Sequence, residues 1–156
     1  MDSKTSERTT RNQIFETIQK RSDIMRNAGF YKFVKNEIAE HVAFATRLNL
    51  DPRTKDLLWW HTPNEGKRSK FEQFLLKIMG VRKGVSDFII IHQTGKYKGL
   101  IIEMKNIGVR TYKKNGDPYF EDQHQFLEDM KKQGFQTCFA NGCNEAWQKT
   151  IEFLNT

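Results

Sequence analysis

The chain has 156 residues, close to the length of one domain, and 37% of them are hydrophobic while 29% are charged. This composition excludes a disordered or fibrous protein, and no apolar run approaches the ~18 residues that a membrane span needs. The polar start of the sequence lacks the apolar segment of a signal peptide, so we expect a cytoplasmic location. The formal net charge of +7 favours a polyanionic partner.

The first 35 residues differ from the rest, because a polar run precedes a short helical pattern there. We predict an N-terminal helical extension over 1–35 and one domain over 36–156. A further helical pattern follows Gly29 and should end before the pair Asp51-Pro52, since proline cannot continue a helix.

The remainder of the chain alternates between strand and helix patterns. Short apolar runs predict strands at 57–61, 87–91, 99–105 and 137–140, and a short connection with a glycine makes the second and third a hairpin. Apolar residues at helical spacing predict helices at 71–78, 120–133 and 145–154. This order is typical of an α/β fold in which helices flank a mixed sheet.

Charged residues end the third predicted strand, where Glu103 and Lys105 follow an apolar run. Residues two apart on a strand share one face, so the two charges belong to one site. A solvated ion pair at a strand end explains them simply, since such pairs are common and contribute little. Asp87 favours a different interpretation, because it opens the preceding strand and the hairpin can place it beside Glu103.

Two neighbouring carboxylates repel each other unless a cation lies between them. Oxygen ligands on a basic protein point to Mg²⁺ or Mn²⁺ and to the hydrolysis of phosphodiester bonds. Lys105 would then orient or deprotonate the attacking water, or stabilise the developing charge. An aspartate followed at a distance by Glu-x-Lys also occurs by chance in unrelated proteins, so this spacing alone is weak support.

Four ordered segments accompany the pattern: His61–Arg68, Met79–Asp87, Glu103–Lys105 and Gln123–Leu127. Together they resemble the VRR-NUC family, a branch of the PD-(D/E)xK nucleases, from about residue 37 to the end of the chain. The resemblance implies a restriction-endonuclease-like core and a divalent-metal-dependent endonuclease. It also implies homodimers, of phage or bacterial origin, that cut branched DNA such as four-way (Holliday) junctions.

By position, the resemblance implies that Asp87 and Glu103 are metal ligands and that Lys105 is the catalytic lysine. Gln123 would face the site from the following helix. Ser86 stands where the family usually has proline, which we expect to alter the turn rather than the chemistry.

The family also has an acidic residue on the helix before the first strand. Glu37 and Glu40 are both candidates for this metal ligand, and we favour Glu40.

Basic residues on both sides of the predicted site are candidate DNA contacts, as is one histidine. They are His61, Lys67, Arg68, Lys70, Arg82 and Lys83. Phosphate contacts of this kind bind without reading sequence, as suits an enzyme that recognises DNA shape. A generally basic surface that only aids solubility is the simpler alternative. A second one is a histidine that caps a strand end.

Two other functions fit part of the pattern: a DNA-binding protein that cleaves nothing, and a sequence-specific restriction-type nuclease. Phosphate-binding loops such as GxxxxGK[ST] are absent from the sequence, so we expect no nucleotide cofactor.

Overall fold

The computed structural model describes residues 36–62 and 69–156, so the predicted N-terminal extension lies outside the described residues. The elements follow the order α3 (Asn36–Leu50), β1 (Leu58–His61), α4 (Lys70–Ile78), β2 (Phe88–Ile91), β3 (Leu100–Lys105), α5 (Glu121–Lys132), β4 (Gln136–Asn141) and α6 (Gly142–Leu154). This order confirms the predicted α/β fold. The last helix begins three residues earlier than predicted, because Gly142 adopts a positive φ of 79° that lets the chain turn directly out of β4.

The four strands form one mixed sheet in the order β1-β2-β3-β4. Strands β1 and β2 pair antiparallel, as do β2 and β3, which confirms the predicted hairpin. Strand β4 runs parallel to β3, since helix α5 carries the chain back between them.

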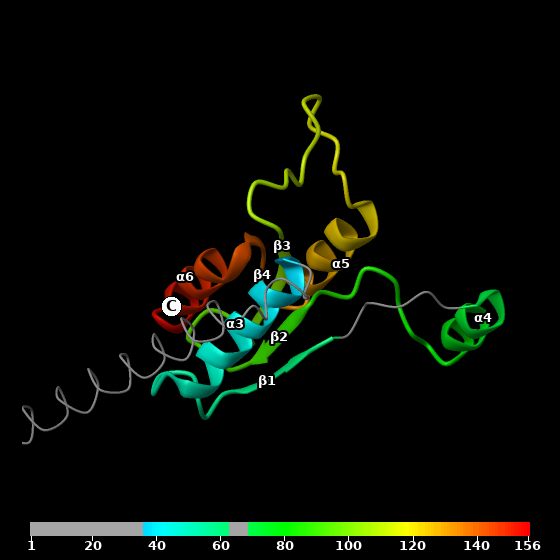
Figure 1. Cartoon of the computed structure of the whole chain (residues 1–156). Helices are drawn as coiled ribbons and strands as arrows, with labels where there is room; N and C mark the ends of the chain where they lie inside the picture. The colour runs from blue at the N-terminus through cyan, green and yellow to red at the C-terminus, as the bar shows by residue number, and fades with distance from the viewer. Residues whose placement is uncertain (1–35, 63–68) are drawn as a thin grey trace, which may run out of the picture.

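Helices cover the two faces of the sheet, as Figure 1 shows. On one face, α3 and α6 pack against residues such as Phe88, Ile90 and Ile102. On the other, α5 places Leu127 against Ile89 and Ile101. Alternate residues of β2 and β3 thus belong to different cores, as the two-residue period of a strand requires.

Helix α4 stands apart from this packed body in Figure 1, and none of its residues is buried. It nevertheless has a well-defined start, since Ser69 and Glu72 form a reciprocal capping box. Among the described residues, no helix combines the length and the apolar character that crossing a membrane requires.

Candidate active site

The β2–β3 hairpin brings Asp87 and Glu103 to the same end of the sheet. Their strands pair Phe88 with Ile102, so one step further along the register sets Asp87 opposite Glu103. The Asp87 Oδ2 atom accepts a hydrogen bond of 2.8 Å from the backbone amide of Met104. The aspartate side chain therefore accepts a hydrogen bond that a backbone carbonyl of β2 would accept if the ladder continued. This bond fixes the orientation of the side chain.

Glu103 and Lys105 form a buried ion pair on the face of the sheet that α5 covers. Their Nζ and Oε1 atoms lie 2.8 Å apart, and only 1% of Glu103 and 9% of Lys105 is exposed. The Lys105 ammonium also lies 4.4 Å from the centre of the Phe120 ring. A solvated ion pair at a strand end is therefore not what the structure contains.

Burial first, and the neighbouring Asp87 carboxylate second, together raise the pKa of Glu103 to about 7, against the opposing effect of Lys105. The second oxygen of Glu103, Oε2, is buried without a hydrogen-bond partner among the described residues. A divalent cation would balance the charge of two buried carboxylates that repel each other, and it would coordinate the oxygen that lacks a donor. The donor set of Asp87 and Glu103 thus fits the cation that the sequence predicts.

Gln123 lies on α5, which covers the same face of the sheet as Glu103 and Lys105. Its Oε1 atom is buried and has no hydrogen-bond partner in the described part of the chain. An unsatisfied buried oxygen of this kind is available to a ligand.

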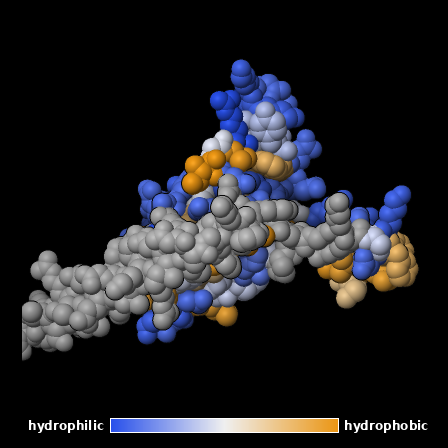
Figure 2. All heavy atoms as spheres, in the orientation of Figure 1, coloured by the Kyte–Doolittle hydropathy of each residue, from blue (hydrophilic) through white to orange (hydrophobic). Residues whose placement is uncertain are grey.

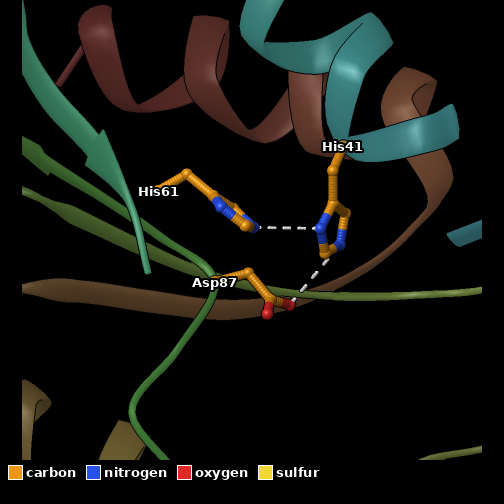
Figure 3. A group of neighbouring side chains, drawn as sticks. All are labelled: His41, His61 and Asp87. Carbon is orange, nitrogen blue, oxygen red and sulfur yellow. Dashed lines mark hydrogen bonds and ion pairs between the residues drawn. The ribbon is translucent and has the colours of Figure 1, made fainter. Parts of the chain in front are cut away.

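Two histidines approach Asp87 from the other side, and Figure 3 shows the three side chains converging. His41 Nε2 lies 3.7 Å from Asp87 Oδ2, while its Nδ1 lies 3.1 Å from His61 Nε2. One potential donor atom from each residue lies within 4.8 Å of the other two. His61 was predicted as a DNA contact and His41 was not predicted at all, although its place on α3 one turn after Glu37 was a usable signal.

The two glutamates of α3 have different surroundings. The Glu40 carboxylate accepts a 2.6 Å hydrogen bond from the Cys143 amide, at the start of α6. Glu37 precedes His41 by four residues and so lies on the same side of the helix as His41. The structure therefore directs Glu40 toward α6 and leaves Glu37 on the side of the helix that bears His41.

The predicted basic residues divide into three groups. Lys67 and Arg68 lie outside the described residues. Lys70 is exposed at the start of α4. Arg82 and Lys83 are exposed and line a cleft of about 1040 Å³ between α4 and α5, to which Gln123 also contributes. The structure thus places two predicted DNA contacts in one cleft with the predicted glutamine.

Asp87 and the Glu103-x-Lys105 pair lie together at one end of a mixed sheet, which is the arrangement that the resemblance to a nuclease family implies. The model of the VRR-NUC domain matches residues 31–144, so the chain belongs to the VRR-NUC family, a nuclease family. The fold is similar to that of a solved "VRR_NUC domain protein", with a TM-score of 0.62 and 22% identity over 78% of this chain and 90% of that chain. The search of curated proteins finds no match.

Proposed function

We propose that this protein is a divalent-metal-dependent endonuclease that hydrolyses phosphodiester bonds in branched DNA, and that it acts as a homodimer with two active sites. The observation that carries this proposal is the convergence of Asp87, Glu103 and Lys105 at one end of the sheet. Family membership supports a nuclease, and the net charge of +7 supports a polyanionic substrate.

In this proposal, Asp87 and Glu103 hold Mg²⁺ or Mn²⁺ with their carboxylate oxygens. The cation would supply positive charge to the scissile phosphate and help to activate water. The backbone amide of Met104 keeps Asp87 in place through its 2.8 Å hydrogen bond. The position of Glu103 is fixed in the same way by its buried pair with Lys105.

Lys105 has a second part in the proposal. Binding of a cation by Glu103 would weaken its ion pair with Lys105. The Lys105 ammonium could then stabilise the negative charge that develops on the reacting phosphate. The stacking of this ammonium on Phe120 keeps it at the site while the charge around it changes. Gln123, whose Oε1 is unsatisfied, would orient water or the substrate.

Arg82 and Lys83 would bind the DNA backbone in the cleft beside Gln123. The other proposed DNA contacts are Lys70 and His61, together with Lys67 and Arg68, which lie outside the described residues. Contacts to phosphates alone select DNA by its shape. Two such sites in a homodimer would engage opposite strands of a branched substrate. This is why a four-way junction is the substrate that we propose.

The test compares cleavage of a labelled four-way junction, a flap and a linear duplex with Mg²⁺ or Mn²⁺. Asp87→Asn keeps the size of the side chain but removes its charge, so we expect at least ~100-fold slower cleavage. Lys105→Met should have a similar effect. Asp56→Asn, at an exposed carboxylate outside the site, is the matched control and should cut like the wild type. Wild-type rates in Asp87→Asn would refute the assignment of the site.

The same assay separates the alternatives. A non-cleaving DNA-binding protein would bind the junction in gel shifts and cut no substrate with any divalent cation. A restriction-type nuclease would cut linear duplex at defined sequences.

A further inference from the structure

We propose that His41, His61 and Asp87 form a second cation position, selective for a transition-type divalent ion. The two histidines offer nitrogen ligands, which such ions prefer and which Mg²⁺ avoids. This position shares Asp87 with the proposed catalytic pair, yet its other ligands come from α3 and β1 rather than from β3.

The sheet separates the two positions. Glu103 alternates with Met104 along β3 and so faces the α5 side, whereas His41 contacts the Phe88 ring within the α3 side of the core. Asp87 lies at the end of the ladder between them. One carboxylate can thus serve an oxygen-rich position on one side and a nitrogen-rich position on the other.

The geometry is close to what an ion requires. Two ligands of one ion with ~2.1 Å bonds are at most about 4 Å apart, and the three donor atoms here all lie within 4.8 Å of one another. A contraction of under about 1 Å therefore completes the set. His41 Nε2 is buried without a hydrogen bond among the described residues, so this nitrogen is available to coordinate a metal ion. His61 is exposed, so an ion has a route in from solvent.

The test measures Co²⁺ binding by titration calorimetry and visible absorption, on untagged protein with millimolar Mg²⁺ and no DNA. We expect one Co²⁺ per chain in the wild type. His41→Ala and His61→Ala should each weaken binding at least about tenfold. His92→Ala, at an exposed histidine outside the cluster, should not. Since His61 is exposed, its variant remains informative if His41→Ala unfolds.

Two results would overturn the proposal: Co²⁺ affinity unchanged within twofold in both histidine variants, or its loss in Glu103→Gln, which would place the ion at the oxygen-rich position. Because DNA is absent, a failure here leaves the proposed nuclease activity standing. If the protein binds Co²⁺ as expected but never cuts DNA, the second cation position stands and the proposed nuclease activity fails.

A different observation carries a second inference, which concerns α4. Phe71, Phe74, Leu75 and Ile78 form an apolar stripe along this helix, and Phe71 and Ile78 are each 67% exposed. Figure 2 shows this patch of hydrophobic side chains on the projecting helix. A nine-residue helix is marginal in water by itself, so it needs a surface to pack on.

Part of the sheet also exposes apolar side chains in the described part of the chain. Leu58 pairs with Ile91 across β1 and β2, and Trp60 stands on the same face. All three side chains are exposed, Leu58 by 66%. Helix α5 contacts β3 and β4 on this side. Within residues 36–62 and 69–156, no helix covers the apolar face over β1 and β2, which we call the open sheet face.

The connection between α4 and β2 runs along α5. Gly84, at φ +73°, passes so close to α5 that an added Cβ would collide with the Asp122 backbone, and Val85 packs into the α5 side of the core. These contacts fasten the connection between α4 and β2 to α5, while Figure 1 shows α4 projecting from the packed body. We therefore infer that α4 packs on the open sheet face of a second copy of this chain, and that the exchange is reciprocal.

Such an exchange closes as a two-fold dimer and satisfies both exposed faces of each copy. This inference identifies the interface of the homodimer, and it rests on the proposed function, which includes that homodimer. The exchange also brings α4, and with it the cleft lined by Arg82 and Lys83, next to the partner copy.

The test mixes two chains of different mass, one carrying Leu58→Cys and the other Ile78→Cys, under mild oxidation. We expect a disulfide between the two chains. Interference from the native cysteines should be small, since Cys143 is buried and burial raises the pKa of Cys138 to about 12. The double variant should give a covalent dimer, whereas a disulfide closed within one chain would show that α4 covers its own sheet and would overturn the inference.

Sedimentation of unmodified chains gives an independent readout. Ile78→Glu should convert the dimer to a monomer, while Gln73→Glu adds the same charge on the opposite side of α4 and should leave the dimer intact. A dimer that persists in Ile78→Glu would refute the α4 exchange but not the homodimer. A monomeric wild type would refute both, yet leave the cleavage assay to decide the nuclease proposal.

Discussion

Lys105 holds only one oxygen of Glu103. The Nζ atom lies 2.8 Å from Oε1, whereas Oε2 is buried without a hydrogen-bond partner among the described residues. The negative charge of Asp87 also repels the Glu103 carboxylate. The ion pair therefore anchors the glutamate but does not neutralise the site. Two carboxylates with one ammonium leave a net negative pocket in a protein of net charge +7, which favours a cation at this point.

The pKa of Glu103, raised from 4.5 to about 7 by burial and by Asp87, makes the stability of the cation-free protein depend on pH. The folded state binds the proton more tightly than the unfolded state does. The stabilisation is therefore complete below about pH 4.5 and is lost as the pH rises to about 7. At ~1.4 kcal/mol per pKa unit, the loss is on the order of 3 kcal/mol.

Glu103→Gln removes this titration, so the variant should gain stability relative to the wild type between pH 5 and pH 8. Urea denaturation in the presence of a chelator measures the difference. A constant difference between the two proteins across this range would contradict the assigned pKa.

The two α3 glutamates should separate into a structural and a functional residue. Glu40→Gln weakens the 2.6 Å contact with the Cys143 amide at the positive end of α6, so we expect a loss of about 1 kcal/mol in unfolding free energy. Glu37→Gln, on the side of α3 that bears His41, should instead weaken Mn²⁺ binding with little change in stability. Thermal melting and Mn²⁺ titration of both variants give the answer. The reverse pattern would support Glu40, the metal ligand that the sequence favours.

Arg82 and Lys83 should contribute to DNA affinity through phosphate contacts alone. Replacement of both by alanine should weaken binding of a four-way junction and lower the slope of log K against log salt by about 2. Lys96→Ala combined with Lys98→Ala, at exposed positions in the β2–β3 connection, provides a control of equal charge. If the control pair lowers the slope as much as the cleft pair, the basic surface is a general one.

Gly84 and Gly80 form a matched pair, since both have positive φ, of 73° and 87°. Gly80→Ala meets open space and should cost about 1 kcal/mol for backbone strain. Gly84→Ala also collides with the Asp122 backbone, so the loss should be clearly larger, roughly 2–4 kcal/mol. Equal losses in chemical denaturation would mean that the segment does not press on α5.

The order of the elements and the pairing of β2 with β3 could be predicted from the sequence. Apolar runs with a two-residue period, separated by a short connection, determine which residues share a face, and this local rule already places Asp87 beside Glu103. The Glu103–Lys105 pair follows from the same period, although only the structure shows that it is buried.

Contacts between distant segments were decided by the tertiary structure. His41 meets Asp87 and His61 because α3 packs across the ends of β1 and β2, and no spacing along the chain encodes that crossing. The direction of Glu40 depends on where α6 begins, about a hundred residues later in the sequence. Helix α4 was predictable as a helix, but its separation from the sheet was not. Local periodicity determines which face of a helix is apolar, whereas only the rest of the fold determines whether that face finds a surface in its own chain.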